Sequence, residues 1–425
     1  MLNQSALKDK TKLDYKQIAF ILYFCGLNAH KTGSRFDSGF CAVTFVVLMA
    51  FELVSVFKNN GKLLISNAFI FYLVFLFYYT LSVVWTKSVS DTLSFTTYFV
   101  QVFGLVFMLN NNILHNHGAE KYLKYILWSL IYMVIVLIIK TPMFSWGSER
   151  VGASIGLNAN DLGLRCVIGM LLALFLQKKH PIMYKAVLLL FLIISLFSGS
   201  RKALGMAIMG IFIYYALKNR GLKSLLNIGI AAIVSLILLY LVLNDSVLYE
   251  LMGWRIMTIL NKYTIFGNIK SIGYVRSTYS LEERQFFISY AMKMFYQKPL
   301  LGWGGDGFRT QMSAIGYSHV TYSHCNYTEL LSTLGIVGFL LYYIFEFAIL
   351  IKSFIQFRRD GNTMYLMAFT IILVNIFAEF FYVSYYSPFV QSIIVIMYLL
   401  NLKSKRYETG EEVCTVHEKT WESIL

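Results

Sequence analysis

Residues 63–85 read LLISNAFIFYLVFLFYYTLSVVW and contain no charged side chain. A helix of about 20 apolar residues is long enough to cross the hydrocarbon core of a bilayer. Because an unpartnered backbone amide costs several kcal/mol in hydrocarbon, a spanning segment must be a helix or belong to a closed barrel. The apolar residues follow one another without alternation, so this stretch predicts a transmembrane helix rather than a barrel strand.

Stretches of this kind recur along the whole chain. Of its 425 residues 57% are apolar and only 14% are charged, a composition typical of membrane proteins. An apolar window of about 20 residues gives about twelve candidate spans. They cover residues 17–30, 38–57, 63–85, 92–109, 121–140, 155–176, 181–197, 202–217, 225–243, 329–351, 364–381 and 385–402. The sequence therefore predicts an all-α fold, a polytopic membrane helix bundle of about twelve transmembrane helices.

Positive charges predict the orientation of this bundle. Lys and Arg near span ends are retained on the cytoplasmic side. One alternate set of connections is rich in them, from the four lysines of residues 8–16 to the three cations of residues 403–406. Both termini are therefore predicted to be cytoplasmic. The formal charge of +15 mostly flanks apolar segments instead of forming a basic stripe, so nucleic acid is not an expected partner.

The same orientation places the one long polar segment outside the cytoplasm. The predicted organisation is a transmembrane bundle of about nine spans (1–243), a large extracytoplasmic catalytic loop (244–328), about three further spans (329–402) and a cytoplasmic tail (403–425). Eight Lys and Arg residues lie in the loop. Positive charges are usually retained in the cytoplasm, but this tendency weakens for long translocated segments, so a cationic outer loop is compatible with it. A cationic loop on the outer face favours an anionic ligand.

Two features stand out inside this loop. Residues 281–296 space their apolar side chains at intervals of three and four, which predicts an amphipathic helix lying on the membrane face and ending at Pro299. The following stretch, Leu300-Leu-Gly-Trp-Gly-Gly-Asp-Gly-Phe308, lets the backbone approach another group closely. It lacks the ending and the preceding strand of a phosphate-binding loop. Direct ligand contact and simple tight turns both remain open for it.

Neither a cofactor nor a metal is expected. The five cysteines stand singly and far apart, without a CxxC pair or a disulfide framework. His319 and His324 are close in sequence, but no Asp or Glu accompanies them at convincing ligand spacing.

Four stretches carry a family resemblance. They are Arg150-Val-Gly-Ala-Ser-Ile-Gly-Leu-Asn-Ala-Asn-Asp-Leu-Gly163, Ser198-Gly-Ser-Arg-Lys-Ala-Leu204, the helix of Arg284 followed by Lys298-Pro-Leu-Leu-Gly-Trp-Gly-Gly305, and His324-Cys-Asn-Tyr-Thr-Glu-Leu-Leu-Ser-Thr-Leu-Gly-Ile-Val-Gly338. In this order, with the long loop between the second and the last, the chain resembles the O-antigen ligase and polymerase superfamily, which includes Wzy-type repeat-unit polymerases.

This resemblance implies a function. The protein would be a polysaccharide polymerase for O-antigen, capsule or exopolysaccharide, moving a glycan from undecaprenyl diphosphate to the hydroxyl of a lipid-linked repeat unit. It would be an inverting, metal-independent glycosyltransferase of the bacterial cytoplasmic membrane, with its active site on the outer face. The implied partners are the undecaprenyl-diphosphate-linked donor and acceptor, membrane lipids, a flippase and a chain-length regulator.

Three alternatives stay open. A ligase would use the same donor and site but transfer the finished glycan to a lipid core or a protein. A membrane transporter or flippase would have about twelve spans, although no matching pair of Gly- or Pro-interrupted spans is visible in the two halves. A non-enzymatic partner in an envelope assembly complex is the third.

Arg201 is the first predicted catalytic residue. It lies at the outer mouth of a predicted span, directly after residues 198–200. A charge at the bilayer edge is costly unless it snorkels, pairs or binds an anion. An anion at this helix N-terminus would gain from the free backbone amides as well as from the guanidinium.

Arg284 is the second predicted catalytic residue. The resemblance makes it the partner of Arg201 at a diphosphate, because planar guanidinium forks match phosphate oxygens. Two alternatives remain: Arg276 could take this place, and Arg284 could instead pair with Glu282 or Glu283.

His324 is the third, at the exit of the loop. An imidazole can accept a proton from an attacking sugar hydroxyl, which is the role that the resemblance implies, whereas most lone histidines are structural. Further predicted substrate-binding residues, besides Arg276, are Asn158, Asn160, Asn326, Trp303 and Glu379. The asparagines could equally cap helices. Trp303 could belong to an interfacial aromatic belt, and Glu379 could pair with a cation.

Overall fold

The computed structural model describes residues 14–58, 63–116, 118–142, 146, 151–177, 180–218, 222–246, 249, 253, 256–257, 272–317, 319 and 322–407. Within these residues the regular structure is helical and no strand is present. The α-helices are α1 (Tyr15–Ala29), α2 (Arg35–Lys58), α3 (Asn67–Leu81), α4 (Val89–Asn116), α5 (Ala119–Lys140), α6 (Ala159–Leu176), α7 (Pro181–Phe197), α8 (Arg201–Lys218), α9 (Leu222–Asn244), α12 (Ile272–Gln297), α13 (Gly307–Ala314), α14 (Asn326–Asp360), α15 (Thr363–Ala378) and α16 (Pro388–Tyr407).

The all-helical fold is confirmed, and each predicted span coincides with a helix. Within the described ranges, six helical segments are long and apolar enough to cross a membrane: Arg35–Lys58, Asn67–Val84, Val89–His115, Ala119–Lys140, Ala159–Leu176 and Asn326–Asp360. Three shorter apolar helices add to them, at Pro181–Phe197, Thr363–Ala378 and Pro388–Leu402. The chain is thus a multi-pass membrane protein by composition and helix length, while the count of about twelve spans stays a prediction.

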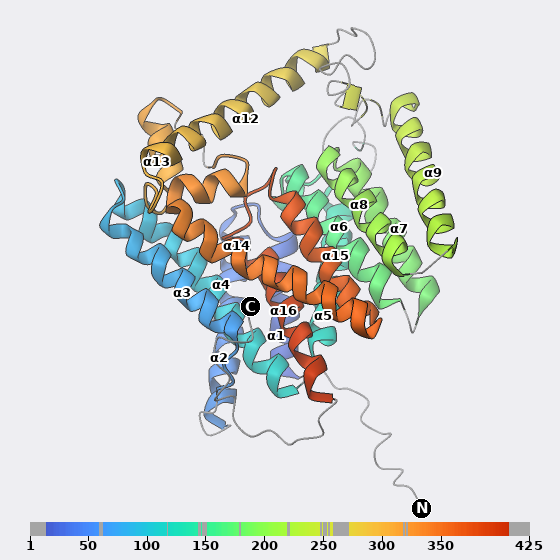
Figure 1. The fold of residues 1–425 in the computed structure, drawn as a ribbon, viewed down its shortest axis with the longest axis horizontal. Coiled ribbons are helices and arrows are strands. Elements are labelled where there is room, and N and C mark those ends of the chain that lie inside the picture. The colour runs from blue at the N-terminus through green and yellow to red at the C-terminus, as the bar shows by residue number, and fades with distance from the viewer. Residues whose placement is uncertain are drawn as a thin grey trace, which may run out of the picture.

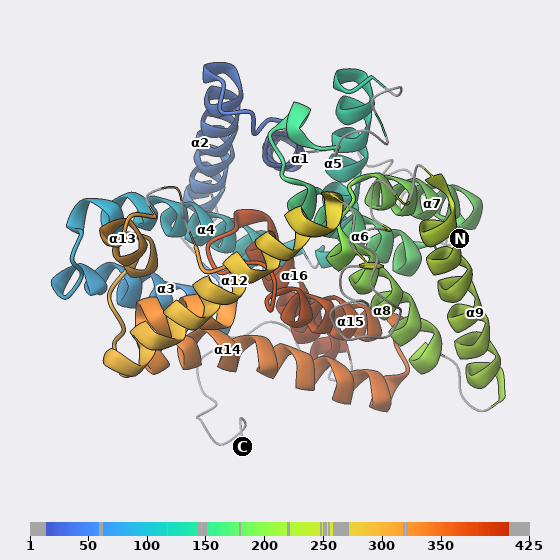
Figure 2. The same cartoon turned by 90° about the horizontal axis from the view of Figure 1, so that it is seen from above.

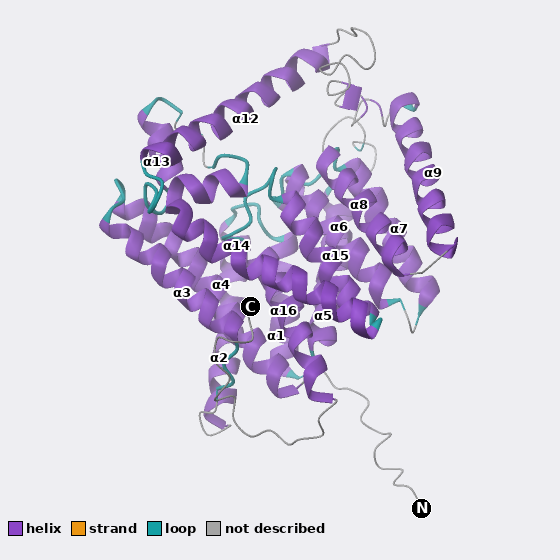
Figure 3. Ribbon diagram, in the orientation of Figure 1, coloured by secondary structure: helices purple, strands orange, loops and turns teal. Residues whose placement is uncertain are grey.

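The segment predicted to be extracytoplasmic lies over one end of the bundle. Figure 1 shows α12 crossing that end, with α13 at its C-terminal side, and Figure 2 shows the same arrangement from above. Connecting loops gather beneath α12, as Figure 3 shows. Helix α12 begins at Ile272, nine residues before the predicted start at 281. Of the predicted loop, residues 247–248, 250–252, 254–255, 258–271, 318 and 320–321 lie outside the described part of the chain.

The amphipathic pattern of α12 is satisfied by packing against α13. Phe287, Ala291 and Met294 form one buried stripe at helical spacing, and this stripe contacts Phe308 and Met312. Arg284 lies one turn before Phe287 on the same helix. The stripe therefore directs α12 toward the rest of the protein and brings Arg284 to its inner side.

Helix α6 forms the centre of the bundle. All its residues from Asp161 to Leu176 are buried, and Arg165 is among them. The guanidinium of Arg165 lies 3.1 Å from Asp161 Oδ1, bonds Asn28 of α1 and faces the ring of Phe389 of α16. Because a buried charge must be paired, this network fixes α6 between α1 and α16. It thereby fixes the N-terminus of α6, which faces the start of α8.

The glycine-rich turn approaches the backbone of α14. Gly335 has φ +65° and ψ −168°, which divides α14 in two. The turn enters at this break: Trp303 N donates to Ser332 O (3.0 Å), Gly304 N to Thr333 O (2.8 Å) and Ile336 N to Pro299 O (2.8 Å). The predicted close approach is confirmed, and the approached group is the chain's own helix. These bonds fix the C-terminal end of α12 relative to α14.

Replacing Gly335 by alanine is expected to destabilise the protein. A Cβ at this position would lie 2.2 Å from Leu300 O and 2.7 Å from Gly302 N, and the left-handed φ adds about 1 kcal/mol of strain. We expect a lower melting temperature in detergent, because the turn can no longer pack against the backbone of α14. Gly229→Ala is the matched control, since no atom lies within 4 Å of its Cβ position. An unchanged melting temperature for Gly335→Ala would contradict this account.

Candidate functional site

A cavity of about 400 Å³ lies at the end of the bundle that α12 covers. Its polar lining consists of Arg201 and Lys202 from α8, Arg284 and Gln285 from α12, and His324 from the loop before α14. The three predicted catalytic residues, far apart in sequence, therefore share one cavity. A cationic wall with one imidazole can hold an anion and accept a proton.

Arg201 is the first residue of α8, and a short turn positions it. The Ser200 hydroxyl donates to Asn160 Oδ1 at 3.0 Å, and its oxygen accepts from Ala203 N at 3.4 Å. Ser200 thus caps α8 and joins its N-terminus to that of α6. Gly199, at φ +63°, allows the chain to reverse before the cap. An anion in the cavity would meet the guanidinium and the positive end of the α8 dipole together.

Lys202 closes one side of the cavity. Its ammonium donates to Phe381 O at 2.7 Å and lies 5.3 Å from the centre of the Phe381 ring. This contact joins the start of α8 to the segment that follows α15. Lys202 therefore contributes positive charge to the cavity while bonding a neutral carbonyl.

Arg284 faces the cavity from α12 and is largely withdrawn from water. Burial is the main cause that lowers the pKa of its guanidinium, and Tyr322 and Glu283 act in the opposite direction. The predicted alternative partner Glu283 lies with its Oε1 3.8 Å from His319 Nε2. Of the two competing arginines, Arg284 has a described side chain, and it lies in the cavity lining. Arg276 lies eight residues earlier on α12, about 12 Å along the helix, and its side chain is outside the described part.

His324 has a left-handed backbone, with φ +65°. Such a conformation in a residue other than glycine costs of order 1 kcal/mol and is maintained by its surroundings. Its ring meets the Tyr322 ring edge-on at 4.6 Å and stacks over Phe287 at 6.0 Å. Burial, followed by the charges of Arg284 and Lys202, lowers the pKa of His324 from 6.5 to about 4. The imidazole is therefore neutral at ordinary pH and able to accept a proton.

The remaining predicted residues stand behind the cavity instead of lining it. Asn158 caps α6, with its Oδ1 accepting from Asn160 N and Asp161 N. Asn160 holds Ser200, as described above. Trp303 donates its indole N–H to Met294 O at 2.9 Å, and the ammonium groups of Lys87 and Lys298 lie over its ring. Sugar contacts by these residues stay predictions.

Asn326 and Glu379 are likewise buried behind the cavity. The capping alternative for Asn326 was wrong, because Cys325 is the N-cap of α14. Asn326 Nδ2 instead donates to Tyr343 OH, and its Oδ1 accepts from Ser384 N and Tyr385 N. The alternative cation pair of Glu379 was also wrong, since among the described residues its carboxylate contacts only neutral donors.

An aromatic wall of the cavity was missed from the sequence. Phe377, Phe380 and Phe381 line it at the C-terminal end of α15, and all three rings are partly exposed. Hydropathy alone places them at the end of the predicted span 364–381. Their spacing of three and four residues, which places them on one face of the chain, was the available signal.

Comparison with known families agrees with this geometry. Residues 186–343 match a family model described as O-antigen ligase. The resemblance to the O-antigen ligase and polymerase superfamily is confirmed. The matched region extends from α7 into α14 and includes Arg201, Arg284 and His324, so the whole cationic side of the cavity lies inside it. It covers a little over a third of the chain. No curated protein shows significant similarity.

The O-antigen ligase match supports a glycosyltransferase-like function of the ligase or polymerase type. Residues 1–185 and 344–425 fall outside it, and they include the N-terminal helices and the segment with the aromatic wall. The family therefore accounts for the charged part of the cavity, and the rest of its lining is read from the structure alone.

Proposed function

We propose that the protein polymerises lipid-linked repeat units of a surface polysaccharide, using undecaprenyl diphosphate as the glycan carrier. The observation that carries the proposal is the shared cavity of Arg201, Arg284 and His324. Two guanidinium groups suit a diphosphate, and a neutral imidazole beside them suits a hydroxyl that must lose its proton. The aromatic wall next to them offers apolar surface for the first part of a lipid chain.

The proposed reaction has one displacement step. The acceptor hydroxyl oxygen bonds the anomeric carbon of the donor while the bond from that carbon to the phosphate oxygen breaks. The electron pair leaves with the diphosphate, whose charge Arg201 and Arg284 stabilise, and the hydroxyl proton moves to His324. Attack opposite the leaving group inverts the anomeric configuration. The arginines neutralise the leaving group in this scheme, so we propose a metal-independent transfer.

The proposal includes a setting for the protein. The cavity would face the outer side of a bacterial cytoplasmic membrane, with both termini in the cytoplasm. A flippase would deliver the lipid-linked units and a chain-length regulator would limit their polymerisation. The positive charge of the predicted cytoplasmic connections supports this orientation.

The test uses purified full-length protein with a lipid-diphosphate-linked repeat unit. A ladder of chain lengths, retained in EDTA, is the expected result. One transfer to a lipid-core or protein acceptor, without a ladder, would favour the ligase, the alternative that the description of the matched family supports. Loss of activity in EDTA that returns with added metal would refute the metal-independent scheme.

The pH dependence of transfer follows from the environment of His324. Because its pKa is about 4 in the free protein, kcat/KM should stay constant from neutral pH down to about pH 5 and fall only near pH 4. A bound diphosphate offsets the charges of Arg284 and Lys202, so the acid limb of kcat should lie at higher pH. Steady-state rates across this range measure both limbs. A kcat/KM limb at 6.5, the ordinary histidine value, would contradict the assignment.

The same pKa affects stability. Between pH 6.5 and pH 4 the unfolded chain binds a proton at His324 and the folded protein does not, so stability falls as the pH is lowered through this window. Above pH 6.5 the contribution of His324 is fully present. The acid limbs of kcat and kcat/KM must therefore be compared at pH values at which the protein remains folded.

A further inference from the structure

Two carboxyl groups meet inside the bundle, away from the cavity. Glu346 of α14 and Glu379 at the end of α15 are 1% and 0% exposed. The amide Nδ2 of Asn375 donates to Glu346 Oε1 at 3.3 Å and to Glu379 Oε1 at 3.2 Å. One amide nitrogen can reach both carboxyl groups only when they are close neighbours. The proposed transfer reaction uses neither of them.

The donors around the two carboxyl groups are unequal. Glu379 Oε1 accepts three hydrogen bonds, from Asn375, from Tyr342 OH at 3.0 Å and from Ser384 Oγ. Glu346 Oε1 accepts from Asn375, and the Tyr342 hydroxyl also lies near this carboxyl group. The second oxygen of each group, Glu346 Oε2 and Glu379 Oε2, is buried without a donor. The surroundings therefore stabilise a carboxylate at Glu379 more strongly than a carboxylate at Glu346.

In the part of the chain that the structure describes, neither carboxyl group forms an ion pair with a cation. The titratable side chains that face the pair are Tyr72 of α3 and Tyr327, Tyr342 and Tyr343 of α14. The nearest side chains from α15 and α16, Asn375 and Gln391, are neutral. Two adjacent carboxylates in a low-dielectric interior repel one another strongly, and such pairs hold one proton between them.

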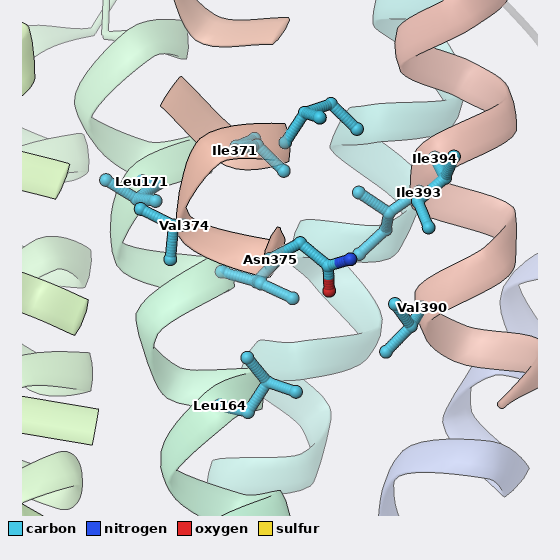
Figure 4. Close-up of a pocket in the computed structure, with 10 residues that line it drawn as sticks. Leu164, Leu171, Ile371, Val374, Asn375, Val390, Ile393 and Ile394 are labelled. Atoms are coloured by element: carbon cyan, nitrogen blue, oxygen red, sulfur yellow. The ribbon is translucent and has the colours of Figure 1, made fainter. Parts of the chain in front are cut away.

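The interior beside Asn375 is sealed by aliphatic side chains. Figure 4 shows its amide reaching into a small pocket between α6, α15 and α16, whose other lining residues are Leu, Ile and Val. The pocket measures about 10 Å³, which is room for about one water. Asn375 Oδ1 has no protein partner there. This side of the bundle therefore provides no charged group for the carboxyl pair.

Glu379 is connected to the loop that holds His324. Its backbone oxygen accepts from Asn326 N at 2.8 Å, and its side chain accepts from Ser384, whose backbone N donates to Asn326 Oδ1 at 3.1 Å. Asn326 follows His324 by two residues, and His324 has a strained left-handed backbone that needs firm neighbours. Glu379 also lies between Phe377 and Phe380 of the cavity wall. A displacement of Glu379 would reach both sides of the cavity.

We propose that Glu346 and Glu379 share one proton, carried by Glu346 and donated from its Oε2 to Glu379 Oε2, and that this pair is a positioning unit for His324. The expected effect of this unit on turnover rests on the proposed function, whereas the existence of the shared proton does not depend on that function. Loss of the proton leaves two buried anions that repel, which moves Glu379 and with it the start of α14.

The first test detects the proton directly in the full-length protein. Infrared spectroscopy of the purified protein at neutral pH should show protonated carboxyl absorption that shifts in deuterium oxide, and the difference spectrum between wild type and Glu346→Gln should contain one such band. Glu52→Gln is the matched control, because Glu52 is equally buried but bonds Asn111, Asn112 and Lys16 and should not contribute to that band. A difference spectrum without that band would overturn the shared proton, whereas a band common to both proteins would come from another buried carboxyl group such as Glu329 or Asp306.

The second test separates positioning from simple structure. A glutamine amide supplies the same donor to Glu379 at every pH, so Glu346→Gln should retain turnover within about fivefold at neutral pH, whereas Glu346→Ala should lose about tenfold or more. Wild-type turnover should fall at alkaline pH as the pair loses its proton, and Glu346→Gln should lack this limb. If both proteins show the same alkaline limb, the positioning role is wrong. If the infrared band behaves as expected but no variant transfers glycan, the proposed function fails and the proton pair stands.

Discussion

Replacing His324 by alanine is expected to lower the rate of glycan transfer by about 10²- to 10⁴-fold, the range that a positioned general base contributes. In the structure the imidazole is kept neutral by burial and by two neighbouring cations, so it is in the form that accepts a proton. The loss should appear in kcat, because the proton moves in the transition state and contributes little to substrate binding. Single-turnover transfer from a lipid-linked donor measures this step.

Two further variants make this prediction specific. Asparagine tolerates the left-handed backbone of His324 better than alanine does, so His324→Asn tests loss of the base without added strain. His319→Ala is the control on the same segment, since its side chain is 70% exposed and is not part of the cavity lining. If His324→Asn keeps more than about a tenth of the wild-type rate, which is less than a general base contributes, the catalytic assignment is wrong.

The sequence anticipated the elements that depend on local pattern. Uninterrupted apolarity predicted the helices, the intervals of residues 281–296 predicted an amphipathic helix there, and the Ser-Gly-Ser-Arg stretch predicted Arg201 at a helix start. Each of these rests on propensity or periodicity within a few turns of chain. That Arg201, Arg284 and His324 share one cavity is a long-range fact, and the family resemblance supplied it where the local pattern could not.

Other features depend on contacts between distant segments. Hydropathy treats residues 326–360 as one apolar helix, whereas Gly335 breaks it because residues 299–304 bond its backbone there. Glu379 looked available for a sugar, but its burial follows from the approach of α14 and residue Ser384. The Phe residues of the aromatic wall look like any membrane-boundary residues until α8 and α12 are placed beside them. Such outcomes require the tertiary arrangement.

Replacing Arg201 or Arg284 by alanine should each lower transfer by about 10²- to 10³-fold, the effect of removing one preorganised group from a developing charge. Lysine at either position keeps the charge but loses the guanidinium fork, so partial activity is expected. If both arginines act on one diphosphate, the double variant should lose less than the product of the two single losses. Lys293→Ala, an exposed cation of α12, should leave the rate unchanged.

Replacing Arg284 should also change the pKa of His324. Because the charge of Arg284 is one of the causes that lower the pKa of the imidazole, Arg284→Ala should move the acid limb of kcat/KM to higher pH, even though the residual rate is small. A change confined to folding would lower the rate without moving the limb. If the acid limb stays near pH 4 in Arg284→Ala, the guanidinium does not lower the pKa of His324 across the cavity. Arg284 and His324 would then not act as parts of one site.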